Sequence, residues 1–167
     1  MMAKKNDSVS LLTKTAILLA LALIFQIGLA SLAQPVVGPL VNMVLILAVL
    51  TTHPGSAVLI GCMTPMAAFM LGIMPLFPVI PVIMMGNISL VLVFSMLKKN
   101  VWLAVVLAAM TKFLVMAGLI RILAAFFIPG LPAPILAAMT FPQFFTALLG
   151  GFLAVVIDRR LPWKILS

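Results

Sequence analysis

Few side chains in this sequence could carry acid–base or metal chemistry. The only acids are Asp7 and Asp158, there is no glutamate, and His53 and Cys62 are the only histidine and the only cysteine. A single cysteine cannot form a disulfide framework or a paired-thiol metal site. Because catalysis and metal binding need several such groups together, we expect no catalytic residue, no metal ion, no cofactor and no enzyme activity.

Two cations, Lys112 and Arg121, stand within apolar stretches of the chain. An ionised group near the centre of a bilayer costs several kcal/mol unless it is paired or hydrated, and neither acid is near them in the sequence. The charge could be compensated by an anionic ligand, by water and backbone carbonyls or, at Lys112, by loss of the proton. For Arg121, snorkelling toward the membrane interface is the alternative.

The composition shows what kind of element must position these groups. Of 167 residues, 66% are hydrophobic and 7% are charged, whereas an ordinary soluble domain has roughly a quarter charged residues. A spanning helix takes about 20 apolar residues, and glycine, proline and charged residues divide the chain into six such segments. They cover residues 11–32, 36–52, 56–76, 79–97, 101–128 and 135–157. The sequence therefore predicts an all-α polytopic membrane protein with six transmembrane helices in one bundle.

The cations that flank these segments set the expected orientation. All of them fall on one side of the membrane if both termini are cytoplasmic, as the positive-inside rule requires: Lys4, Lys5, Lys14, Lys98, Lys99, Arg159, Arg160 and Lys164. Trp102 and Trp163 lie beside them, where aromatic rings anchor at the interface. We expect residues 1–10 to be a cytoplasmic amino tail, 11–157 the membrane domain and 158–167 a basic cytoplasmic tail. The net charge of +8 then reflects topology and not a nucleic-acid partner.

The first segment has a second interpretation. A basic stretch, an apolar stretch and the triplet Ser31-Leu32-Ala33 could form a cleaved secretory signal. Against this, residues 11–32 are long enough to span a membrane. Ala16 and Ala20 also have the small-xxx-small spacing that lets helices approach closely, although packing within the bundle would explain that spacing equally well.

Polar side chains in these segments fall at a similar height. At about 1.5 Å per residue, Gln26 lies about 22 Å up the first segment and Arg121 about 30 Å along the fifth, and three more amides lie near outer ends. Polar residues within spans tend to face a bundle interior or water, so a shared level favours an outward-opening pocket, although interhelical hydrogen bonding would explain each amide singly. The candidate substrate-binding residues are Arg121, Asn87, Gln143, Asn42, Gln26 and Lys112. The nine-residue spacing of Lys112 and Arg121 places them on opposite sides of a straight helix, and we favour Arg121 because it lies at the level of the amides.

Short motifs along the chain resemble those of a known family. They are the alanine-rich stretch 15–22, Gly38-Pro39-Leu40-Val41-Asn42, Gly86-Asn87, and the stretch from Phe141-Pro142-Gln143 to Gly150-Gly151. In this order they resemble the substrate-binding S components of energy-coupling factor transporters, which import vitamins and related micronutrients into prokaryotes. The resemblance covers nearly the whole chain and includes its length and the six predicted spans.

The resemblance implies a multi-pass binding subunit of an ATP-driven importer in the prokaryotic cell membrane. Ala16 and Ala20 would form a docking face for a membrane-embedded scaffold subunit, itself coupled to two ATPase subunits. The substrate would bind near the outer face, capped by the loop around residues 33–39, and the subunit would topple in the membrane to deliver it. The lack of a GxxxxGK[ST] phosphate loop agrees with an energy source in a partner, whereas the turn at 51–55 lacks the basic residue often found there in the family.

The motifs do not identify the substrate. Because Arg121 has no acid partner within the membrane, we expect a small molecule with a carboxylate or other negative group, such as an anionic vitamin. Two other functions fit the sequence: a small-solute facilitator or channel that works alone with Arg121 as an anion filter, and a ligand-free structural subunit of a membrane complex.

Overall fold

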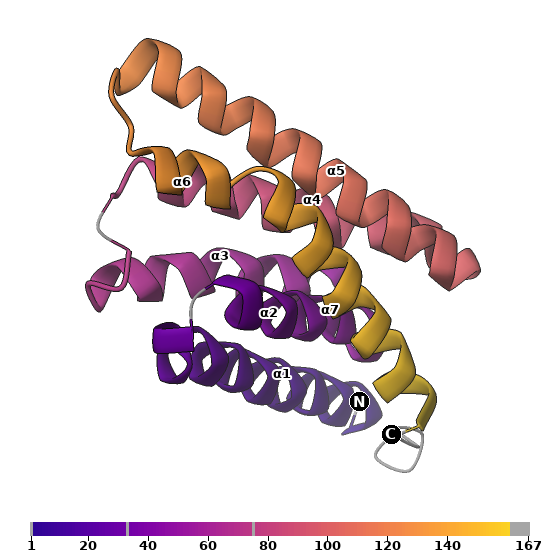
Figure 1. Ribbon diagram of the computed structural model, residues 1–167. Coiled ribbons are helices and arrows are strands. Elements are labelled where there is room, and N and C mark those ends of the chain that lie inside the picture. The colour runs from indigo at the N-terminus through magenta and orange to yellow at the C-terminus, as the bar shows by residue number, and fades with distance from the viewer. Residues whose placement is uncertain (1, 33, 75, 161–167) are drawn as a thin grey trace.

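The computed structural model describes residues 2–32, 34–74 and 76–160, with the side chains of 8–32, 35–74 and 76–160. All regular secondary structure in these ranges is helical (Figure 1). The α-helices are α1 (Met2–Leu23), α2 (Gln34–Thr51), α3 (Pro54–Met70), α4 (Val79–Leu97), α5 (Val101–Ile122), α6 (Ala133–Ala138) and α7 (Phe141–Arg160). The chain is therefore an all-α protein over its described part. Trp163, Lys164 and Ala33 lie outside the described residues.

The long helices pack lengthwise into one bundle. Helix α2 packs against α7, far from it in the sequence, while α4 packs on α5 and α3, and α1 lies against α2 and α3. The first and last described residues lie at the same end of the bundle (Figure 1). The central core is apolar and contains Leu45, Ile46, Ile60, Leu90 and Phe94, all completely buried.

Several helices are suited to a membrane. Three helical stretches are long and apolar enough to cross a bilayer, Ser8–Gly28, Val79–Phe127 and Ala133–Arg160, and Pro35–Thr51 and Pro54–Met70 are shorter apolar helices. The stretch Val79–Phe127 contains both α4 and α5, which the short 3₁₀ turn Lys98–Asn100 joins.

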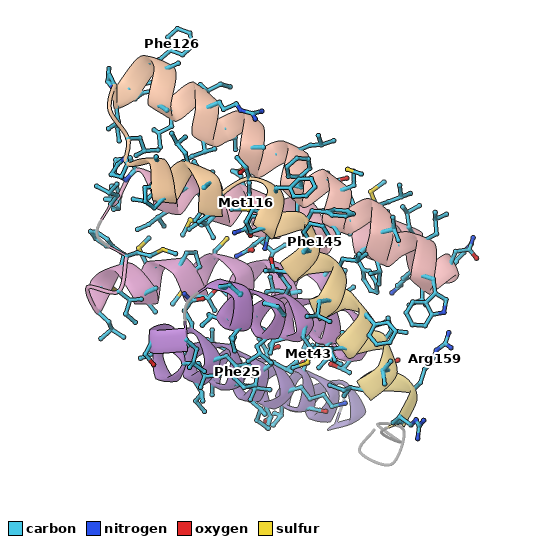
Figure 2. All side chains as sticks on the ribbon, viewed as in Figure 1. Phe25, Met43, Met116, Phe126, Phe145 and Arg159 are labelled. Atoms are coloured by element: carbon cyan, nitrogen blue, oxygen red, sulfur yellow. The ribbon has the colours of Figure 1, made fainter. Side chains whose placement is uncertain are left out.

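The bundle exposes large apolar side chains on its surface and buries several polar side chains in its interior. Met70, Met96 and Phe126 are each nearly four-fifths exposed, and Figure 2 shows Phe126 pointing away from the bundle. Lys112 is buried at 3% exposure, together with several amides. In water such an exposed apolar surface would favour aggregation, whereas in lipid it matches its surroundings. The inverted polarity agrees with a membrane protein.

The predicted segments and the observed helices differ at three places. Helix α1 begins at Met2, so the first helix starts nine residues before the predicted segment 11–32. Helix α3 ends at Met70, and Gly72 then turns the chain with a φ of 72°. The predicted sixth span is two helices, because Pro142 has no N–H to continue the ladder to Ala138 and the chain breaks between α6 and α7.

Candidate functional site

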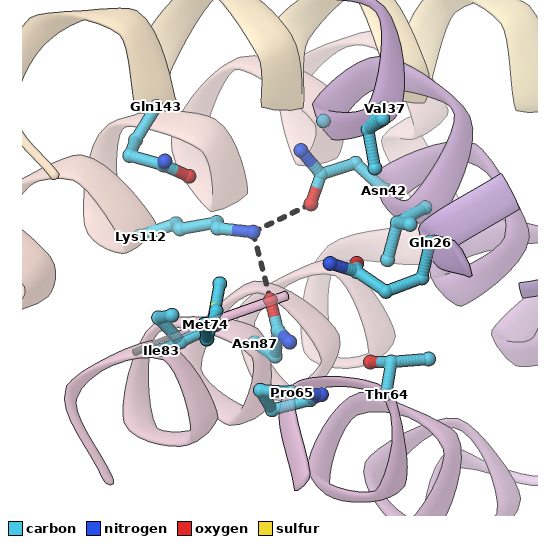
Figure 3. A pocket seen from close by; sticks show the side chains of 12 residues that line it. Gln26, Val37, Asn42, Thr64, Pro65, Met74, Ile83, Asn87, Lys112 and Gln143 are labelled. Atoms are coloured by element: carbon cyan, nitrogen blue, oxygen red, sulfur yellow. Dashed lines mark hydrogen bonds between the residues drawn. The ribbon is translucent and has the colours of Figure 1, made fainter. Parts of the chain in front are cut away.

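A buried lysine joins three helices of the bundle. The Nζ of Lys112 on α5 donates hydrogen bonds of 2.6 Å to Oδ1 of Asn42 on α2 and of 2.8 Å to Oδ1 of Asn87 on α4. Lys112 follows the start of α5 by eleven residues, or about 16 Å, and therefore lies near mid-helix. Figure 3 shows the ammonium group between the two amides.

A proline determines which way the Asn87 amide points. Pro65 in α3 lacks an N–H, so the carbonyl of Gly61 has no partner four residues along the helix. Asn87 fills that vacancy, since its Nδ2 donates to the Gly61 oxygen over 2.8 Å. A carbonyl can only accept, and the Asn87 oxygen must then face Lys112.

The orientation of the Asn42 amide is set by a similar chain of bonds on α7. The hydroxyl of Thr146 donates to the backbone oxygen of Gln143 over 3.2 Å and accepts from Asn42 Nδ2 over 3.4 Å. This leaves the Asn42 oxygen for Lys112. The Gln143 side chain donates over 2.9 Å to the carbonyl of Ala138, the group that Pro142 leaves without a helical partner. The Gly61 carbonyl thus orients the Asn87 amide, and the Gln143 carbonyl orients the Asn42 amide through Thr146, so that both amide oxygens face the Lys112 amine.

Glycines bring these helices close enough for the network to form. A Cβ on Gly150 would lie 2.5 Å from the Pro39 oxygen and 2.7 Å from Asn42 Cβ, and one on Gly61 would lie 3.0 Å from Asn87 Cβ. At Gly86 it would collide with the side chain of Met116. Small residues allow close backbone approach between membrane helices, and here they occur beside Asn42, Asn87 and Lys112.

The polar network borders a cavity. Figure 3 shows its lining from α1 to α7: Gln26, Val37, Gly38, Val41, Asn42, Thr64, Pro65, Met74, Ile83, Asn87, Lys112 and Gln143. The space in this cavity that is open to the centre of a water-sized sphere is about 30 Å³. Because one water needs about 10–15 Å³ by that measure, the cavity as it stands holds about two waters. A larger molecule requires the lining residues to move apart.

Two lining residues have polar atoms that remain available. Thr64 is 1% exposed and its hydroxyl has no hydrogen-bond partner among the described residues. Gln26 is half-buried on the π-helical turn Ile24–Gly28 at the end of α1, and its side chain points toward the same space (Figure 3). Single π turns often occur at functional sites. The cavity thus extends from Lys112 at mid-bundle to the bundle end opposite the chain termini.

The electrostatic character of the cavity is positive or neutral. None of the described residues that line it is acidic, and Asp158 is fifteen residues from Gln143 along α7, about 22 Å away. Among the described residues no group of three or more His, Cys, Asp or Glu could hold a metal ion. The arrangement offers hydrogen-bond donors to a ligand.

The structure brings together five of the six predicted substrate-binding residues. Asn42, Asn87, Gln143, Gln26 and Lys112 line the cavity, and Arg121 does not. Arg121 is exposed on α5, because its spacing from Lys112 places the two on opposite sides of the helix. The geometric argument from spacing is therefore correct, but the preference for Arg121 over Lys112 does not agree with the positions found.

Other positions also follow from the fold. Ala16 and Ala20 are both exposed on α1. The sequence interpretation missed Thr64 and Thr146, since threonines in apolar helices give no distinct signal. The spacing Gly61-x-x-x-Pro65 could have indicated a free carbonyl in α3.

No family model, no curated protein and no solved structure matches this chain. The functional conclusion therefore depends on the geometry of the site and on the sequence motifs.

Proposed function

We propose that this protein is the substrate-binding subunit of an ATP-driven importer of the energy-coupling factor type, and that it captures a small micronutrient in the cavity beside Lys112. The observation that carries the proposal is the buried lysine, held by two oriented amides beside a cavity that helices throughout the bundle line. Buried ionisable groups in membrane bundles mark ligand or ion sites.

The proposed topology has six spans with both termini in the cytoplasm. Four described cations support it, because they lie in the turn between α4 and α5 or in the last turn of α7, at the bundle end that holds the chain termini: Lys98, Lys99, Arg159 and Arg160. Arg159 lies over the Trp102 ring at 5.3 Å, an arrangement suited to a membrane interface. In this orientation the cavity lies between mid-membrane and the outer face.

The energy source in this proposal is external. The chain has no phosphate-binding loop, and a membrane-embedded scaffold subunit with two ATPase subunits would supply the work. The exposed alanines Ala16 and Ala20 leave room on α1 for a closely packed partner helix. We propose this face as the docking surface for the scaffold.

A ligand-free structural subunit is the second candidate. It is favoured by one observation: Lys112 already bridges α2 and α4 through two hydrogen bonds, and little open space remains. In that case the network would only hold helices together.

Purification of the full chain in mild detergent separates these functions. Mass spectrometry of small molecules released on denaturation should find one compound in stoichiometric amount, and affinity purification from native membranes should recover a scaffold and ATPases. A chain that recovers those partners without any ligand would support the structural subunit. Solute uptake into liposomes by the chain alone would support a facilitator and contradict an ATP-driven importer.

A further inference from the structure

We infer that Lys112 and Thr64 form a subsite for a single carboxylate group, so that the ligand of the proposed importer is a small monocarboxylate whose acid group binds deepest. This inference rests on the proposed function for its biological meaning. The subsite itself follows from the hydrogen-bonding capacity that the network leaves unused.

Lys112 retains one donor for a ligand. A protonated amine has three N–H groups, and two are taken by the oxygens of Asn42 and Asn87. Both amides are fixed by backbone carbonyls or by the Thr146 hydroxyl, so they cannot turn their NH₂ groups toward Lys112. Hydrogen bonds to two fixed acceptors help to stabilise the charged amine, and in that form one N–H remains for the cavity that Lys112 lines.

Thr64 supplies a second donor, and its behaviour differs from that of other threonines in the chain. A helical threonine can bond the carbonyl four residues earlier, and several do so here: Thr13, Thr15, Thr51, Thr52 and Thr111. The Thr64 hydroxyl makes no hydrogen bond within the described residues although it is buried. A buried polar group that makes no hydrogen bond destabilises the folded state. Since this hydroxyl borders the cavity, a ligand acceptor would remove that destabilisation.

The number of donors and charges selects a carboxylate over larger anions. The cavity presents one cation, and the Asn42 and Asn87 oxygens near it would repel a multiply charged phosphate. Phosphate sites in proteins usually collect several donors or an arginine, and the lining residues that the structure describes include no arginine. Val37, Val41 and Ile83 form apolar walls nearby, which suit a compact apolar body attached to the acid group.

Acetate and acetamide are matched probes for this subsite, since they differ in charge but hardly in size. The full chain would be labelled with ¹³C at the lysine side chains and purified in detergent, and the Lys112 signal would be assigned by its loss in Lys112→Gln. At constant ionic strength, acetate should shift this signal saturably and acetamide should not. Thr64→Val should weaken acetate binding about tenfold, as expected for a lost hydrogen bond to a charged group, whereas Thr64→Ser should stay within about twofold.

The outcomes separate a binding role from a structural one. Because Thr64→Val removes an unpartnered hydroxyl, it should keep or raise the thermal midpoint while it weakens acetate. The subsite is refuted by unsaturable or absent acetate shifts, by equal responses to acetamide, by Thr64→Val with wild-type acetate affinity, or by chloride binding as tightly as acetate. A chain that recovers scaffold and ATPases but fails this titration would retain the importer proposal and reject only the carboxylate subsite. A chain that binds acetate but recovers no scaffold or ATPases would retain the carboxylate subsite and reject the importer proposal.

Discussion

Lys112 and Asn42 are joined by a hydrogen bond of 2.6 Å across 70 residues of sequence. The bond links α5 to α2 inside an apolar bundle, where few polar groups compete for either partner. The second bond from Lys112, to Asn87, ties α4 to the same point. A cation held by neutral oxygens, with no acid beside it, is both a structural junction and an attraction for an anion.

The two asparagines should respond differently to replacement by aspartate. In Asn42→Asp the Thr146 hydroxyl can rotate and donate to the new carboxylate, so the fold should persist and an internal ion pair should lower acetate affinity at least tenfold. In Asn87→Asp a carboxylate oxygen would face the Gly61 carbonyl, which cannot donate, at a cost of about 1–3 kcal/mol. Thermal unfolding in detergent measures the difference. Equal thermal midpoints of the two variants would show that the amide orientations are not fixed as described.

Helices α2 and α7 approach each other too closely at Gly150 for any side chain to fit there. In Gly150→Ala the new Cβ would meet the backbone oxygen of Pro39 at 2.5 Å, and backbone cannot yield as a flexible side chain does. We expect a loss of about 2 kcal/mol or more and a weakened Lys112 network. Gly118→Ala on α5 is the matched control, because nothing lies within 4 Å of its added Cβ, and it should be neutral or slightly stabilising. If both variants unfold at the same temperature, the close α2–α7 approach is not present.

Arg121 should be dispensable for ligand capture. Its side chain is exposed and does not line the cavity, so Arg121→Ala should leave the affinity for acetate within about twofold of the wild type. Lys112→Gln should reduce the same affinity at least tenfold. Equilibrium titration of both variants compares them directly. A large loss in Arg121→Ala with little effect of Lys112→Gln would move the anion site to the outer end of α5.

Large side chains on the proposed docking face should block docking without affecting ligand binding. Ala16→Phe with Ala20→Phe should keep the bundle folded and ligand binding intact, because both positions are exposed. The double variant should no longer recover the scaffold and ATPases from native membranes. Ala125→Phe, at another exposed alanine, is the control and should recover them normally. Normal recovery by the double variant would remove α1 from the interface.

Hydrophobic patterning predicted the helices well because charge and turn residues separate them clearly. The segments 36–52, 79–97 and 101–128 agree closely with α2, α4 and α5 extended by its π turn. The break between α6 and α7 was missed, since Pro142 was counted within an apolar run although its effect falls four residues earlier, on the Ala138 carbonyl. The early start of α1 was missed because polar residues at a helix end carry no hydrophobic signal.

The sequence named five residues that line the cavity but favoured Arg121, which does not line it, over Lys112. A shared height along the helices brought out the amides and Arg121, and the lack of an acid partner brought out Lys112, but height says nothing of direction around a helix. Deciding between Lys112 and Arg121 requires the rotation of α5 against its neighbours, which depends on close contacts such as those at Gly86. Thr64 could not be selected from sequence, because only the three-dimensional arrangement leaves its hydroxyl without a partner.

The most direct test compares what the wild-type chain and two variants carry out of the membrane. Wild type, Arg121→Ala and Lys112→Met would be purified side by side in mild detergent, and released small molecules would be quantified by mass spectrometry. We expect one small carboxylic acid from wild type and Arg121→Ala, and at least tenfold less from Lys112→Met of equal folded yield. The same amount of the same compound from Lys112→Met, or no bound compound in wild type, would contradict a ligand site at Lys112.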